Sequence, residues 1–234
     1  MPKVNVHKPG SLCWIELATT DQPSAKKFYQ QLFGWTSDDM PMGPGAFYTM
    51  FKLDGSDVAA AYTLGPDQLQ RGVPTHWNLY VAVANVDESA KRAEELGASV
   101  LASPFDVFDA GRMAIIQDPT GAILSLWQAK AHSGVLVNNE EGALCWADLM
   151  TRDRDKASEF YSALLVGGSR KRTRIRHMAT ITSRMGRITS EGSRPRNIPI
   201  RTSPRTGTST SRLLIAKRKR PKRSHWGQAC TCRI

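Results

Sequence analysis

The chain has 234 residues, of which 41% are hydrophobic, and a formal net charge of +11. Its four cysteines lack the spacing of a disulfide framework, and no apolar run reaches the roughly 18 residues of a transmembrane helix, which argues against a stapled secreted domain and a membrane span. Because residues 1–7 contain no apolar stretch typical of a signal peptide, we expect a cytoplasmic protein without membrane association.

The N-terminal part predicts a strand followed by a helix. Leu12–Ala18 alternates as a strand does, and Ser24–Phe33 carries apolar side chains at helical spacing. Asp21 is placed to accept hydrogen bonds from the first turn of this helix, and Gly34 is placed to end it.

The remaining predicted elements complete this first unit and then begin a second unit of the same order at Trp77. They are strands at Phe47–Leu53, Val58–Leu64 and Trp77–Val83, a helix at Glu88–Leu96 capped by Asp87, and extended segments at Ser99–Asp106, Arg112–Gln117 and Ala122–Gln128. Tight turns are indicated at Asp54-Gly55 and Asp118–Gly121. Two β-α-β-β-β units in sequence predict an α+β domain built from paired modules.

A longer internal repeat starts again after this domain and then stops. Residues 13–32 and 145–164 share Cys-Trp, an acid, a following Asp and a Phe-Tyr pair, all at one offset of 132 residues. Such constant spacing indicates two copies of one structural unit. We therefore predict a complete domain at 10–130, a linker at 131–141 and the truncated start of a second domain at 142–164.

The C-terminal region differs in composition from everything before it. Residues 167–234 contain 19 of the 32 Lys+Arg residues and a single acid, Glu191, whereas the first 166 residues contain 13 bases and 20 acids. High charge with few apolar side chains predicts disorder, because little burial offsets the entropy lost on folding. We expect residues 165–234 to be a disordered basic tail.

The genetic code suggests how this tail arose. Phe33-Gly34-Trp35 can be encoded TTY GGT TGG, and loss of one base gives TTG GTT GGG, which encodes Leu-Val-Gly, as found at 165–167. Reading 225–230 in the shifted frame permits a match to 96–100. The hypothesis is a one-base deletion near codon 165. The alternative is a functional basic arm around 216–223 that binds nucleic acid, and in either case the tail can bind polyanions non-specifically.

Several short motifs combine into a recognisable pattern. They are Thr20-Asp21 with Phe28-Tyr29, Leu32-Phe33-Gly34-Trp35, Val81-Ala82-Val83 with Val86-Asp87, Glu95-Leu96-Gly97-Ala98, and Asp118-Pro119-Thr120-Gly121-Ala122. With these motifs the chain resembles the vicinal oxygen chelate superfamily, the glyoxalase/bleomycin-resistance/dioxygenase group. It looks most like two-domain bacterial glyoxalase-like proteins, which are often labelled hydroxylases. The resemblance implies two βαβββ modules that form a cupped mixed sheet around a cavity.

Many proteins of this group hold a divalent metal in the cup, and the resemblance shows where its ligands would fall. The four positions are occupied by Trp14, by Ala60 or Ala61, by Asn78 and by Ser125. None of these side chains is a good ligand for zinc, nickel or iron. We therefore predict neither a metal site nor another cofactor.

Strand alternation suggests what the cup contains instead. Trp14 and Glu16 share one strand face, as do Asn78 and Tyr80, and as do Ser125 and Trp127. The predicted binding residues are therefore Trp14, Asn78, Tyr80, Ser125 and Trp127. Glu16 is the catalytic candidate, either as a general base or as the partner of a cationic ligand. The alternative, which carries slightly more weight from the sequence, is a structural acid paired to an Arg or to backbone N–H groups.

The predicted function is binding or transformation of a small organic molecule without the usual metal. Alternatives are a metal-dependent lyase or dioxygenase of the lactoylglutathione lyase kind, and nucleic-acid binding through the tail. Whether the domain catalyses, as a lyase or an oxidoreductase, or only sequesters its ligand stays open. Self-association through the second-domain fragment is also expected, because a lone strand leaves unpaired edge groups.

Overall fold

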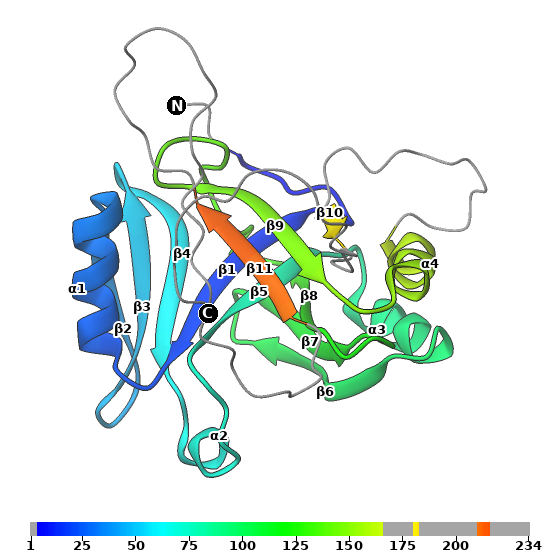
Figure 1. Cartoon of the computed structure of the whole chain (residues 1–234). Helices are drawn as coiled ribbons and strands as arrows, with labels where there is room; N and C mark the ends of the chain where they lie inside the picture. Colours follow the sequence, from blue (N-terminus) through cyan, green and yellow to red (C-terminus); the bar gives the residue numbers. More distant parts are fainter. Residues whose placement is uncertain (1–3, 166–179, 183–209, 216–234) are drawn as a thin grey trace, which may run out of the picture.

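The computed structural model describes residues 4–165, 180–182 and 210–215. Its main body is an eight-stranded mixed sheet with helices packed against it (Figure 1). The strands are β1 (Leu12–Thr19), β2 (Thr36–Gly43), β3 (Ala46–Leu53), β4 (Ser56–Thr63), β5 (His76–Ala82), β6 (Ser99–Val107), β7 (Gly111–Gln117) and β8 (Ile123–Ala129). The helices are α1 (Gln22–Phe33), α2 (Pro66–Gln70) and α3 (Val86–Glu95). Within the described residues no helix is long and apolar enough to cross a membrane.

The sheet consists of two similar halves, which confirms the predicted paired modules. Its strand order is β2-β3-β4-β1-β5-β8-β7-β6. In each half the first strand lies parallel to the last, so that β1 pairs with β4 and β5 pairs with β8. The halves join where β1 and β5 run antiparallel, with Glu16 opposite Asn78. The first strands of both modules therefore meet at the centre of the molecule.

Local signals explain most element boundaries. The Asp21 side chain accepts a hydrogen bond from the Ser24 backbone N–H, and Gly34 ends α1 in the left-handed region at φ 73°. For α3 the predicted cap was wrong. Asn85 accepts the bond from the Glu88 N–H, and Asp87 lies inside the first turn, because the helix starts two residues earlier than its apolar spacing indicates.

Two elements of the first domain were missed altogether. The edge strand β2 reads Thr-Ser-Asp-Asp-Met-Pro-Met-Gly and has almost no apolar alternation, and α2 has only five residues. β2 forms because the hairpin with β3 supplies its partner, with Asp39 opposite Thr49. Pairing, and not propensity, decides such an edge strand.

Alternating side chains give the sheet two apolar faces, as predicted. Ile15, Leu17 and Leu79 point into the larger core beneath the helices. Trp14 and Tyr80, one position along their strands, belong to a second cluster on the concave face. In Figure 1 α1 lies beside β2 and β3 at one end of the molecule, and α3 lies at the other. Among the described residues, no helix contributes to this second cluster.

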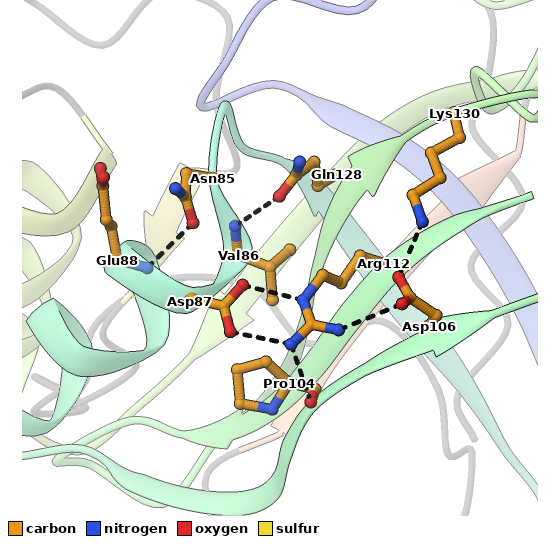
Figure 2. A network of polar contacts seen from close by, with 9 residues as sticks. All are labelled: Asn85, Val86, Asp87, Glu88, Pro104, Asp106, Arg112, Gln128 and Lys130. Atoms are coloured by element: carbon orange, nitrogen blue, oxygen red, sulfur yellow. Dashed lines mark hydrogen bonds and ion pairs between the residues drawn. The ribbon is translucent and has the colours of Figure 1, made fainter.

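Arg112 connects α3 to the strands of its own module and does not line the cup. Its guanidinium donates two hydrogen bonds of 2.8 Å to Asp87 at the start of α3, and it reaches Asp106 at 3.5 Å (Figure 2). Lys130 also contacts Asp106, so the four charged side chains form one surface network. Several partly exposed ion pairs acting together are worth more than one isolated pair.

The predicted linker at 131–141 is part of the core. Val135 and Val137 are fully buried, and the Val135 N–H donates to the Cys13 carbonyl at 2.7 Å. The next residue of the segment, Leu136, donates its N–H to the Asp57 carbonyl of β4 at 2.8 Å. The segment therefore forms a strap that runs back along β1.

The fragment of the second copy packs onto the first domain. It forms β9 (Leu144–Met150) and α4 (Arg154–Leu165), and α4 contacts α3. Phe160 is 3% exposed and joins the main core, and the Tyr161 hydroxyl donates to Asp118 at 2.8 Å. The fragment is therefore packed against the first domain and shares its core.

Strand β9 also has partners on both edges. It pairs parallel with β10 (Thr180–Thr182) and antiparallel with β11 (Thr210–Ile215), the same arrangement that β4 and β5 give β1. Two short segments of the predicted tail thus pair with β9, which gives its backbone groups partners within the chain along β11 and, at Asp148–Met150, along β10. The rest of the predicted tail lies outside the described residues.

Candidate functional site

A cavity of about 700 Å³ occupies the concave face of the sheet. Aromatic and methionine side chains make up most of its wall, and these are Met40, Met42, Phe47, Tyr48, Met50, Tyr62, Tyr80, Phe105, Phe108, Met113, Trp14 and Trp127. Its size lies within the range of about 300–1,000 Å³ that is usual for small-molecule sites. The cavity therefore suits an organic molecule with a large apolar surface.

Glu16 is the buried acid of this cavity. Its side chain lines the wall, yet the residue is only 8% exposed. The Tyr80 hydroxyl donates to Oε1 at 2.6 Å and the Asn78 amide donates to the same oxygen at 3.2 Å. The Tyr48 hydroxyl donates to Oε2 at 2.9 Å. Three neutral donors from two strands thus fix the orientation of the carboxylate.

Further hydrogen bonds hold these donors in place. Trp14 Nε1 donates to the Tyr48 hydroxyl at 3.1 Å, so that this hydroxyl in turn points its own proton at Glu16. On the other side, the Asn78 amide also donates to the Tyr62 hydroxyl at 3.3 Å, and its oxygen contacts His76 Nε2 at 3.0 Å. Glu16 therefore stands at the centre of a continuous polar network inside an apolar cup.

Burial controls the ionisation of this network. Loss of solvent raises the pKa of the Glu16 carboxyl, and the bonds from Tyr80, Tyr48 and Asn78 oppose the rise. Burial and the neighbouring negative charge of Glu16 hold the pKa values of Tyr48 and Tyr80 well above their usual range, so both hydroxyls stay protonated and act as donors. His132, also in the wall, has its pKa lowered by burial and is neutral at neutral pH.

The raised pKa of Glu16 predicts a pH-dependent difference between the protein and its Glu16→Gln variant. Above the unfolded value of 4.5 and up to the folded pKa, the folded state holds more protons than the unfolded state. The contribution of Glu16 to stability is therefore greatest at low pH and falls as the pH rises through this window. Urea unfolding of both proteins from pH 4 to pH 8 should show the variant gaining relative stability with pH. A constant difference would contradict the raised pKa.

The structure brings most of the predicted site residues together. Trp14, Tyr80 and Trp127 line the cavity with Glu16. Asn78 is not part of the wall, and its amide instead donates a hydrogen bond to Glu16, which is part of it. Ser125 is buried in register with Tyr80 and also does not reach the cavity.

Sequence reasoning missed several wall residues. Tyr48 and Tyr62 could have been found, since each alternates with core positions on strands that were predicted. Met40 and Met42 lie on the unpredicted strand β2. His132 lies in the strap, where its ring packs edge-on against Trp14 with centroids 4.5 Å apart. No periodic spacing of residues in the sequence predicts the contact between His132 and Trp14.

The residues at the family's metal-ligand positions do not fit a divalent transition metal. Trp14 offers an indole, Ala60 a methyl group, Asn78 an amide that is already bonded to Glu16, and Ser125 a buried hydroxyl. Within the part of the chain that the structure describes, no three His, Cys, Asp or Glu side chains are grouped as a metal site requires.

Comparison with known proteins agrees with this fold. Residues 11–126 match the model of the Glyoxalase/Bleomycin resistance protein/Dioxygenase superfamily. A Mycobacterium bovis protein named "Putative glyoxylase CFP32" is 45% identical over 166 residues, covering 70% of this chain and 63% of that protein. The "Anthracycline biosynthesis protein DauV" of Streptomyces sp. strain C5 is 36% identical over 168 residues, covering 67% and 61%. The chain thus spans somewhat under two thirds of the length of these relatives.

A solved structure shares the fold at low identity. A mutant of 4-hydroxymandelate synthase from Streptomyces coelicolor superposes with a TM-score of 0.50 at 18% identity, covering 68% of this chain and 53% of that one. Identity this low supports the architecture alone, not a shared reaction.

Proposed function

Residues 11–126 belong to the glyoxalase/bleomycin resistance/dioxygenase superfamily, and on that premise we propose that the domain binds an aromatic organic molecule in its cup without a divalent metal. The observation that carries the proposal is the wall of the cavity. The positions at which many proteins of this group hold a metal are occupied by Trp14, Ala60 and Asn78. These residues offer an indole, a methyl group and an amide that is already bonded to Glu16.

The shape and composition of the cavity support a flat, apolar ligand. Trp14, Tyr80 and Trp127 supply ring surfaces, and aromatic pairs gain about 0.5–1.5 kcal/mol beyond burial when they stack or meet edge to face. The rim methionines Met40 and Met42 are about half exposed, at 52% and 53%. Such unbranched, polarisable side chains adapt to ligands of different outline.

Glu16 supplies the polar contact that gives orientation. A carboxylate in an apolar site can accept a proton or a hydrogen bond from a bound molecule, which suits either ligand capture or proton abstraction. Two relatives bear the names of a glyoxylase and of an anthracycline biosynthesis protein, and both names are consistent with a small organic ligand.

A ligand screen on the metal-stripped full-length protein tests this proposal. After treatment with EDTA, planar aromatic compounds such as 9-anthracenemethanol are expected to raise the melting temperature and to bind in calorimetry. Trp14→Ala should weaken binding by about tenfold or more, because it removes a wall of the cavity.

Trp146→Ala is the matched control for this experiment. Trp146 occupies the position of Trp14 in the second copy, but it is 39% exposed and lies outside the cavity wall. Its removal should leave binding unchanged. Stoichiometric nickel, zinc or iron that survives purification and is required for binding would contradict the metal-independent part of the proposal.

A further inference from the structure

Among the described residues Glu16 has hydrogen bonds but no ion-pair partner, and the one positive neighbour that acts on its pKa is His76. The three groups that donate to it, from Tyr48, Tyr80 and Asn78, are all neutral. The imidazole of His76 contacts the Asn78 amide and not the carboxylate. A buried carboxylate is costly without a cation beside it and is otherwise driven toward its protonated form, so a ligand cation placed here would be stabilised.

The other charged groups of the cavity wall cannot supply it. Lys52 is held by Asp38 at 2.9 Å and by Asp57 at 3.7 Å, and His132 is kept neutral by burial. The wall therefore contains three carboxylates and one ammonium group, a net negative lining. Such a lining attracts cations and repels anions.

One lone pair of the Glu16 carboxylate, on Oε2, is available to accept a hydrogen bond from a ligand. Oε1 accepts two hydrogen bonds, whereas Oε2 accepts one, from Tyr48. A carboxylate oxygen has two lone pairs, so Oε2 has one left among the contacts of the described residues. The indole of Trp14 lies next to this oxygen, since it donates to the same Tyr48 hydroxyl.

The surrounding rings suit a cation as well. Trp14, Tyr48 and Tyr80 belong to the wall around Glu16. The faces of such rings carry partial negative charge and attract ammonium groups within about 6 Å, an interaction worth about 2 kcal/mol when water is excluded. Carboxylate and rings thus favour the same kind of ligand group.

We propose that the ligand of this cavity is an aromatic organic cation, whose ammonium group donates to Oε2 of Glu16 while its rings lie against Trp14 and Trp127. The inference rests on the proposed function and deepens it, because it names the chemical class of the ligand. It assigns to Glu16 the role of a charge anchor.

Three matched probes test the charge requirement on the full-length protein. 9-Anthracenylmethylammonium, 9-anthracenemethanol and 9-anthracenecarboxylate share one ring system and differ in charge. At pH 7.5 the ammonium compound should bind at least about tenfold more tightly than the alcohol, since hydrogen bonds between charged groups are worth about 1.5–3 kcal/mol. The carboxylate should bind most weakly.

Variants then locate the effect. Glu16→Gln should abolish the preference for the ammonium compound, so that the ammonium compound and the alcohol bind to the variant with affinities within about twofold of each other. Glu95→Gln, the same change at a surface site paired with Arg92, should leave all three affinities unchanged. Equal binding of ammonium and alcohol, or a preference that persists in Glu16→Gln, would overturn the inference while leaving the proposed function intact. Failure of all three probes to bind would count against both.

A pH series gives a second test that needs no variant. A primary alkylamine stays protonated between about pH 5 and pH 7.5, so only the protein titrates in this range. The pKa of Glu16 is raised by burial, so binding of the ammonium compound should weaken as the pH is lowered through the titration of Glu16, and it should weaken more than binding of the alcohol does. Parallel profiles for the two probes would overturn the assignment of Glu16 as the anchor.

Discussion

Phe160→Ala is expected to lower the free energy of unfolding by about 3–5 kcal/mol, the usual cost of deleting a buried phenylalanine. Phe160 belongs to the second copy of the repeat, yet it is 3% exposed in the core of the first domain. Its neighbour Tyr161 is bonded to Asp118, which holds α4 against the turn between β7 and β8. The second-copy fragment should therefore unfold together with the domain, in one transition.

The repeat itself supplies the control. Phe28 holds the same place in α1 that Phe160 holds in α4, but it is 52% exposed. Phe28→Ala should change the free energy of unfolding by less than about 1 kcal/mol. Urea denaturation followed by circular dichroism measures both values. Equal, small effects would show that α4 does not contribute to the core, and a separate transition for the fragment would show that it folds alone.

Gly134→Ala is expected to destabilise the protein by about 2–4 kcal/mol, through backbone strain and a direct overlap. Gly134 has φ 118°, which side chains rarely adopt, and a Cβ there would overlap the carbonyl oxygen of Cys13. This carbonyl accepts the Val135 N–H at 2.7 Å. The variant must shift the strap away from β1, so it also threatens the position of His132 in the cavity wall.

Gly72→Ala separates the two causes. Gly72 also has a positive φ, of 70°, but no atom lies within 4 Å of the place where its Cβ would be. We expect it to cost about 1 kcal/mol, the strain of the left-handed conformation alone. Thermal and urea unfolding of the two variants compare the costs. If Gly134→Ala were no worse than Gly72→Ala, the strap would not be pressed against β1.

Much of the site could be predicted from strand periodicity. Trp14 and Glu16 were placed on one face of their strand because side chains alternate along a strand, and Tyr80 and Trp127 were placed in the same way on theirs. The family resemblance implied that these faces line the cup. Alternation on its strand could have placed Tyr48 on the cup face, but its hydrogen bond to Glu16 depends on the order of β3, β4 and β1 in the sheet. His132 lay beyond any periodic reasoning, because its place is fixed by hydrogen bonds of its backbone to Ala110 and to the Trp127 side chain, which no strand pattern predicts.

The sequence by itself determined the repeat, the paired modules and the face on which each strand residue lies, since these follow from spacing along one chain. Only the tertiary structure decided which of two equivalent residues is buried. Trp14 is 3% exposed and Trp146 is 39% exposed, although both follow a cysteine at the same place in the repeat. Burial depends on what packs against a side chain, and in the described part of the chain the first copy has a full sheet around its cup whereas the second has three strands.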